Sequence, residues 1–149
     1  MSLNQRIGIM LYWVAWPGIW LLLKRSKRTR VAIKSEGSIL VVKPWLGNGK
    51  WSLPGGGLHP GEGERSALAR EVFEETGLEL NKNSLKQLKR LTYQQDGLQF
   101  EYVLFTYETP KQAQITRHTP EIAEAAWVKL NKLTKHTANN DVLVALKNT

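Results

Sequence analysis

A glycine-rich turn followed by a charged helix constrains the fold of this chain more than any other stretch. Three successive glycines, Gly55 to Gly57, let the backbone bend freely and approach a ligand closely. A helical pattern then runs from residue 63 or 64 to Thr76, and Gly77 is placed to end that helix in the left-handed conformation. The segment predicts a loop and a helix that act as one unit.

The predicted helix has an apolar side and an acidic side. The apolar side is expected to pack against a sheet and consists of Leu68, Ala69, Val72, Phe73 and Thr76. The acidic side is expected to project outward and consists of Glu64, Glu71, Glu74 and Glu75. Like charges at these spacings repel by roughly 0.2–0.5 kcal/mol per pair. A hard divalent cation offsets this repulsion, because it takes carboxylate oxygens as ligands. The alternative is an ordinary solvated face.

Short apolar runs separated by turn residues predict strands in the rest of the chain. A strand at 31–33, a turn at 36–38 and a second strand at 39–42 form one expected hairpin. Further strands are expected at 88–93 and 100–107, joined by a turn at 94–97, and at 125–129. A closing helix is expected over 137–147, with Thr137 or Asn139 near its start.

The first thirty residues differ from the rest. Ile7 to Leu23 is a run of seventeen residues without a formal charge, somewhat short for a membrane-spanning helix, which needs about 20 residues. Its tryptophans Trp13, Trp16 and Trp20 share a helical face, and Pro17 and Gly18 are expected to kink or interrupt the helix. A basic run follows and consists of Lys24, Arg25, Lys27, Arg28 and Arg30.

Two interpretations of residues 7–30 stay open. In the first, the segment is a short anchor or an interfacial helix on an anionic cytoplasmic membrane surface, because basic residues beside an apolar helix suit such a surface. In the second, its aromatic face packs on the domain or on a second subunit. The chain therefore divides into an apolar and basic segment, residues 1–30, and one domain, residues 31–149.

The composition limits the possible chemistry. The chain contains no cysteine, which excludes disulfides, thiolate zinc sites and cysteine nucleophiles. Its formal charge of +8 attracts phosphates, whether they belong to nucleotides, nucleic acid or lipid. Carboxylates, hydroxyls, histidines or a bound metal must therefore supply the reactive groups.

The spacing around the glycines and the acidic helix resembles the signature of the Nudix hydrolase family. Gly56 is followed after five residues by Glu62, and after seven more by the nine residues from Arg70 to Leu78, matching each defining position. The resemblance extends from about Val31 to Leu133. It implies an α/β fold, a Nudix-type α/β/α sandwich with a mixed sheet. It also implies metal-dependent hydrolysis of a pyrophosphate bond in a nucleoside diphosphate-linked small molecule.

The resemblance also implies which residues form the metal site. Mg²⁺ or Mn²⁺ ions would be held by Glu71, Glu74 and Glu75, with the backbone carbonyl of Gly56. Arg70 would orient a glutamate.

The resemblance leaves the general base open. Glu71 is one candidate, and Glu121 and Glu124, which lie outside the motif, are the others. By the same resemblance, Glu62 would stabilise the loop and the start of the helix.

Other functions and partners follow less directly. The basic charge would assist removal of pyrophosphate from an RNA 5′ end, and a non-catalytic nucleotide-binding module would keep the fold without the reaction. We expect a cytoplasmic protein, which the first interpretation of residues 7–30 would place on the membrane surface or anchor in it, and a homodimer is compatible with the family. Five aromatic residues are candidates for stacking on a base, although each is expected to pack in the core or at the rim: Trp45, Trp51, Tyr93, Phe100 and Tyr102.

Overall fold

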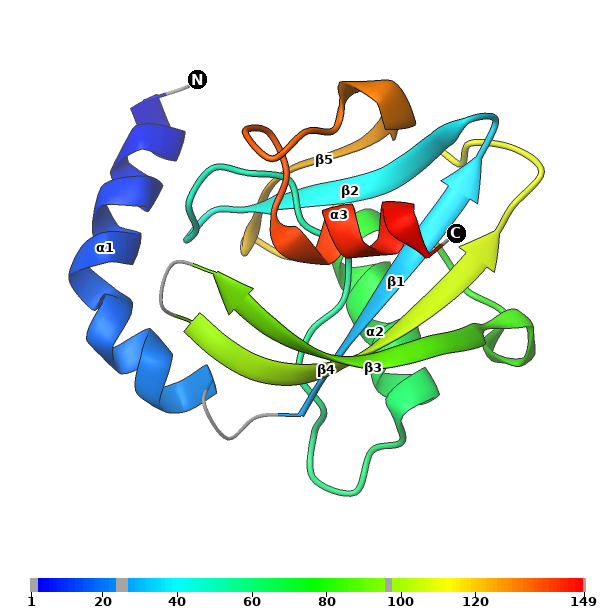
Figure 1. Cartoon of the computed structure of the whole chain (residues 1–149), viewed down its shortest axis with the longest axis horizontal. Helices are drawn as coiled ribbons and strands as arrows, with labels where there is room; N and C mark the ends of the chain where they lie inside the picture. The colour runs from blue at the N-terminus through cyan, green and yellow to red at the C-terminus, as the bar shows by residue number, and fades with distance from the viewer. Residues whose placement is uncertain (1–2, 24–26, 96–97, 149) are drawn as a thin grey trace.

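A mixed sheet lies between helices in the computed structural model of the chain (Figure 1). The structure describes residues 3–23, 27–95 and 98–148, with the side chains of residues 3–5, 16, 19–23, 95 and 98 left out. The helices are α1 (Leu3–Leu23), α2 (Glu64–Thr76) and α3 (Asn140–Lys147), with short 3-10 turns η1 (Lys82–Ser84) and η2 (Leu130–Lys132). The strands are β1 (Arg28–Ser35), β2 (Ser38–Pro44), β3 (Lys86–Gln95), β4 (Leu98–Glu108) and β5 (Ile122–Lys129).

The sheet has the strand order β3-β4-β1-β2-β5. β1 runs parallel to β4, whereas the pairs β1–β2, β2–β5 and β3–β4 are antiparallel. Figure 1 shows α2 behind the sheet and α3 in front of it. The predicted α/β/α sandwich with a mixed sheet is therefore confirmed.

Alternation along the central strands divides the core between the two faces, since successive strand residues point to opposite sides. Val31 and Ile33 belong to the cluster beneath α2, while Ala32 between them belongs to the cluster beneath α3. Leu40 and Ile39 on β2 divide in the same way. Both faces of the sheet are therefore covered.

The predicted strands and the closing helix are present with shifted limits. β1 begins at Arg28 rather than Val31, so Arg28 and Arg30 belong to the sheet and not to a free basic tail. Asn139 directly precedes α3, but its side chain donates to Ser52 Oγ at 2.7 Å instead of capping the helix. Lys24, Arg25 and the turn residues 96–97 lie outside the described residues. The division into residues 1–30 and 31–149 stays a prediction.

Helix α2 has its predicted limits, but two of its side chains lie on unexpected sides. Glu75, expected to project outward, is only 9% exposed and lies with Leu68 and Val72 on the buried side. Phe73, expected to pack on the sheet, is 40% exposed and stacks on His118 with ring centroids 4.9 Å apart. At 100° per residue, position 75 lies between positions 68 and 71 around the helix axis. The side chain of Glu75 therefore falls at the edge of the buried side of α2, next to Leu68.

Helix α1 continues through Pro17 to Leu23, so the expected interruption is absent. It packs close to the loop after β2, because a Cβ added to Gly8 would lie 2.2 Å from the carbonyl oxygen of Trp45. Trp16 and Trp20 lie outside the described side chains. Among the described residues, no helix is long and apolar enough to span a membrane. Membrane attachment, a cytoplasmic location and dimerisation stay predictions.

Gly77 provides a test of how α2 ends. Its φ is +73°, and a Cβ there would lie 2.6 Å from the carbonyl oxygen of Thr116. We expect Gly77→Ala to lower the free energy of unfolding by about 2–3 kcal/mol, because backbone strain and a clash add. Gly37, with φ +71° and open space around it, is the matched control, and Gly37→Ala should cost only about 1 kcal/mol. Urea denaturation measures both, and equal losses would contradict the clash.

Candidate active site

The glycine loop is held along β1 by backbone hydrogen bonds. The Thr29 amide donates to the carbonyl of Gly56 at 2.9 Å, and the Val31 amide donates to the carbonyl of Pro54 at 3.1 Å. The Gly56 carbonyl, expected to bind metal, therefore has one of its two lone pairs engaged. These bonds place the loop between the sheet and α2.

Glu71 lies directly against Gly56. A Cβ added to Gly56 would lie 2.4 Å from the carboxylate carbon of Glu71, so any larger residue would displace that carboxylate. The side chain of Glu71 is 19% exposed. Glycine at position 56 thereby lets the Glu71 carboxylate lie directly against the loop backbone.

Glu75 is buried beside the same loop. Its Oε2 accepts a hydrogen bond from the Gly55 amide at 2.8 Å. Burial raises the pKa of the Glu75 carboxyl to about 8, although the nearby Arg30 and the Gly55 hydrogen bond lower it. Glu71 adds to the increase by like-charge repulsion. A cation bound next to this buried carboxyl would stabilise its ionised form.

Arg70 connects the acidic residues of the site. Its guanidinium contacts both carboxylate oxygens of Glu62, at 3.1 and 3.0 Å, and Oε1 of Glu71 at 3.0 Å. It also lies 3.5 Å from Glu74 and donates to the carbonyl of Gly57 at 3.1 Å. The hydrogen bonds from Arg70 lower the pKa of Glu62 to about 2. Arg70 thereby fixes the loop relative to α2.

Glu121 and Glu124, the two candidate bases outside the motif, have different partners in the structure. Glu124 on β5 forms an ion pair with Lys43, with 3.0 Å between Nζ and Oε2. Glu121 precedes β5 and interacts electrostatically with Arg28, raising the pKa of that guanidinium. Arg28 has the same interaction with Glu71 and Glu75. Glu121 therefore lies close enough to Arg28 to act on its charge, whereas Glu124 is already paired with Lys43.

The sequence alone did not identify two arginines of β1, Arg28 and Arg30, as residues of the site. Burial lowers the pKa of Arg28 to about 10, with a further lowering by Arg30, and the buried Nε of Arg28 has no hydrogen-bond partner. Arg30 donates through Nη1 to the Gly55 carbonyl. Its Nε lies 3.7 Å from Oδ2 of Asp141, a fully buried carboxylate on α3. The spacing of two residues between Arg28 and Arg30 could have indicated their role, because it places both side chains on the same face of a strand.

A cavity of about 240 Å³ opens beside Arg28 on the α3 side of the sheet. Tyr93 and Phe100 form a stacked pair in its wall, with ring centroids 4.7 Å apart. The residues around it are Tyr12, Arg28, Arg30, Pro44, Leu46, Gly47, Asn48, Ser52, Tyr93, Phe100 and Asn139. Aromatic rings next to the partly buried Arg28 suit a flat ring joined to phosphate.

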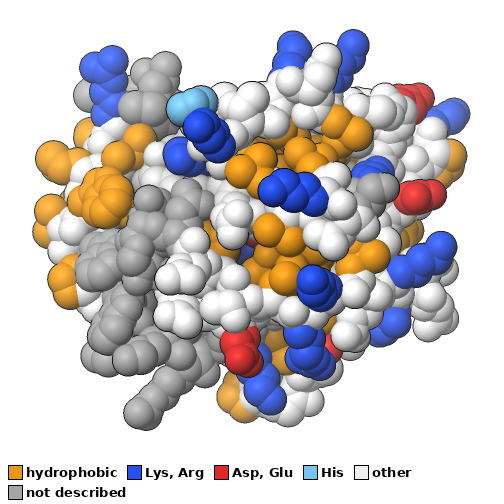
Figure 2. All heavy atoms as spheres, in the orientation of Figure 1, with side chains coloured by type: hydrophobic (Ala, Val, Ile, Leu, Met, Phe, Trp, Pro, Cys, Tyr) orange, Lys and Arg blue, Asp and Glu red, His pale blue; other side chains and the backbone are white. Residues whose placement is uncertain are grey.

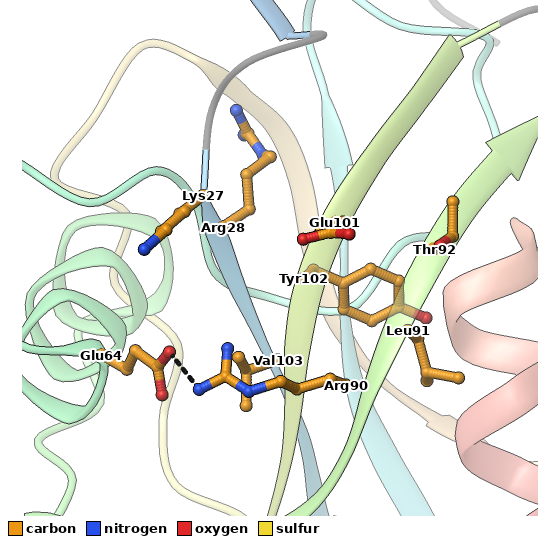
Figure 3. A pocket seen from close by; sticks show the side chains of 9 residues that line it. All are labelled: Lys27, Arg28, Glu64, Arg90, Leu91, Thr92, Glu101, Tyr102 and Val103. Atoms are coloured by element: carbon orange, nitrogen blue, oxygen red, sulfur yellow. Dashed lines mark hydrogen bonds and ion pairs between the residues drawn. The ribbon is translucent and has the colours of Figure 1, made fainter.

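A second cavity of about 190 Å³ lies between the start of α2 and the β3–β4 hairpin (Figure 3). The ion pair between Arg90 and Glu64, 2.8 Å apart, crosses this cavity, whereas Arg28 extends away from that pair. Glu101 and Lys27 also line the wall. The mixture of both charge signs fits an anion less well than the first cavity.

The acidic side chains do not form a closed cage. Within the described ranges, no three histidine, aspartate or glutamate side chains are gathered as a preformed metal site. Glu71 and Glu75 both lie against the glycine loop, while Glu74 is 46% exposed beside Arg70.

Comparison with known proteins agrees with this architecture. A MutT NUDIX hydrolase from Burkholderia pseudomallei has a TM-score of 0.72 at 22% identity, covering 83% of this chain and 97% of that one. A bifunctional NMN adenylyltransferase/ADP ribose pyrophosphatase from Francisella tularensis, complexed with AMP and a manganese ion, has a TM-score of 0.70 at 19% identity, covering 95% and 46%. At these identities the likeness shows the fold.

Sequence comparison extends the likeness. A MutT-like protein from Streptomyces ambofaciens is 26% identical over 108 residues, which cover 72% of this chain and 66% of that protein. Alignments to two Mycobacterium tuberculosis relatives cover only 23% of those proteins. The chain thus spans less than two thirds of the length of these curated relatives.

The fold and the site define an α/β/α protein in which a glycine loop and an acidic helix form one centre. The NUDIX domain model matches residues 24–146. The chain belongs to the Nudix hydrolase family, as the sequence resemblance predicted. Helix α1 precedes the matched residues.

The buried carboxyl of Glu75 predicts a pH-dependent stability. Its pKa of about 8 exceeds the ordinary value of 4.5, so the folded protein binds a proton more tightly than the unfolded chain. Stability from this group is complete below pH 4.5 and is lost as the pH rises towards 8. With a metal chelator present, Glu75→Gln should therefore gain stability relative to wild type, by up to a few kcal/mol, between pH 5 and 8. Chemical denaturation across pH measures it, and parallel profiles would contradict the burial argument.

Proposed function

We propose that this protein hydrolyses a pyrophosphate bond in a nucleoside diphosphate-linked small molecule, with Mg²⁺ or Mn²⁺ as cofactor. One observation carries the proposal. Glu71 and Glu75 lie against the glycine loop and interact with Arg28, which also lines the cavity with the stacked aromatic pair. Arg28 therefore lies between the acidic residues that would bind the metal and the cavity that would bind the substrate.

The donor groups fit a hard divalent cation. Magnesium is usually bound through one or two carboxylates together with substrate phosphates and waters, so a closed cage of three ligands is not required. Glu71 and Glu75 would hold the ion, with the Gly56 carbonyl beside them, and Glu74 would join from the exposed side. The raised pKa of the Glu75 carboxyl supports this assignment, because a bound cation stabilises the ionised form.

The cavity suits a nucleotide-like substrate. The Tyr93 and Phe100 rings in the cavity wall offer apolar surface for a base. The buried Nε of Arg28 is a donor for a phosphate oxygen. AMP and manganese in the structurally similar Francisella protein agree with this choice of substrate and cofactor.

The residues would act in separate steps of an in-line attack by water on phosphorus. A divalent ion held by Glu71 and Glu75 would neutralise the diphosphate charge and lower the pKa of water. As the water oxygen bonds to phosphorus, the bridging P–O bond breaks and the other phosphate-bearing half of the substrate leaves. Arg28 holds the diphosphate, and Arg70 keeps Glu71 in position. Glu121 would accept the proton of the attacking water, since Glu124 is paired with Lys43 and Glu71 would be engaged as a metal ligand.

The first test is hydrolysis by wild type and Glu74→Gln with a panel of substrates. The panel contains nucleoside triphosphates, nucleotide sugars, dinucleoside polyphosphates and triphosphorylated or capped RNA, each with magnesium, manganese or a chelator. We expect metal-dependent turnover of a nucleotide, and a loss of about 100-fold or more in kcat/KM in the variant. Glu79→Gln, at an exposed glutamate just after α2, is the control and should keep full activity.

The panel also separates the alternatives. Turnover confined to RNA, with steep salt dependence, would replace the small-molecule substrate with an RNA 5′ end. Tight metal binding without turnover of any substrate would indicate a non-catalytic module. Activity retained in Glu74→Gln would show that this carboxylate is not a ligand.

The second test concerns the general base. Glu121→Gln should lower kcat by about 100-fold or more with little change in KM, since proton transfer by a positioned base contributes at least that much. Glu124→Gln, which breaks only the contact with Lys43, should stay within about twofold of wild type. The reverse order of effects would exclude Glu121, and loss in neither variant would assign the base to the motif itself.

A further inference from the structure

Helix α1 carries an exposed apolar face. Five of its large apolar side chains are between 39% and 74% exposed: Ile7, Met10, Leu11, Trp13 and Val14. Figure 2 shows hydrophobic side chains gathered along the edge of the molecule formed by α1. Contiguous exposed apolar surface of this kind indicates an interaction site, whereas single exposed apolar residues do not.

The opposite side of α1 is already covered by the domain. Tyr12 is buried, and Gly8 lies so close to Trp45 that no side chain would fit between them. At 100° per residue, Gly8 and Tyr12 lie on the side opposite Met10 and Val14. Over residues 7–14, α1 thus has one side covered by the domain and an apolar side exposed, as expected of a helix that lies at an interface.

The charge around α1 selects an anionic partner. The first 35 residues contain seven lysines and arginines and no aspartate or glutamate, although two of the seven, Arg28 and Arg30, lie in the sheet beside the candidate site. Among the described ones, Arg6 at the start of α1 and Lys27 after its end are exposed. Two copies meeting through α1 would bring these cationic segments together, which disfavours a second copy as the partner. An anionic lipid surface is attracted to them, and tryptophan such as Trp13 favours the lipid interface.

We propose that the exposed face of α1 docks the protein on the surface of an anionic lipid bilayer. Apolar side chains of that face enter the boundary between headgroups and acyl chains, while the flanking basic residues contact the headgroups. Tyr12, on the covered side of the same helix, lines the cavity beside Arg28. Docking therefore brings this cavity next to the lipid headgroups. The docking is independent of the proposed hydrolysis.

The test is sedimentation of the full chain with phosphatidylcholine vesicles that contain or lack phosphatidylserine, without substrate. Wild type should sediment with the anionic vesicles, less with the zwitterionic ones, and less again at high salt. The double variant Met10→Gln with Val14→Gln should bind the anionic vesicles about tenfold or more weakly. Glutamine keeps helix propensity, so circular dichroism should match wild type.

The matched control replaces two exposed apolar residues that belong to β3 and η2 and not to α1. Leu88→Gln with Leu130→Gln, each 37% exposed in wild type, should leave vesicle binding unchanged. Equal binding by wild type and the α1 variant, or no preference of wild type for anionic vesicles, would overturn the proposal. So would a wild-type dimer in analytical ultracentrifugation that becomes monomeric in the α1 variant, because a second copy would then cover this face.

Discussion

The pairing of the glycine loop with the first half of β1 is the constraint on which the site depends. Hydrogen bonds from Thr29 and Val31 hold Pro54 and Gly56 beside the central strand. The same loop then contacts α2 through the carboxylates of Glu71 and Glu75. Strand, loop and helix are thus locked together before any ligand binds, which gives a reactive centre its preorganised geometry.

Buried charge extends this constraint across the sheet. Arg30 contacts the Gly55 carbonyl on one side and Asp141 of α3 on the other. Burial raises the pKa of the Asp141 carboxyl, and Arg30 and the amides of Leu53 and Val142 oppose that increase. Ion pairs of this kind cost desolvation energy and contribute little net stability, but breaking one partner is strongly destabilising. The position of α3 is therefore coupled to the glycine loop.

The motif allowed the family, the sandwich and the limits of α2 to be predicted, because spacing and propensity are local properties. The side taken by Glu75 was predicted wrongly, since a helical wheel treats every carboxylate as seeking water. A buried position is possible here only because the Gly55 amide and Arg30 stand opposite it. Arg28 and Arg30 were interpreted as part of a basic run that follows an apolar segment, and not as residues of a strand.

The sequence by itself determined the glycine turn, the acidic helix, its terminator at Gly77 and the excess of positive charge, since these follow from residue types at short spacings. Only the tertiary structure decided which glutamates meet the loop, that Glu124 pairs with Lys43 while Glu121 acts on Arg28, and which side of α1 is covered. These depend on contacts between residues far apart in the chain, and such contacts arise from packing of the whole domain.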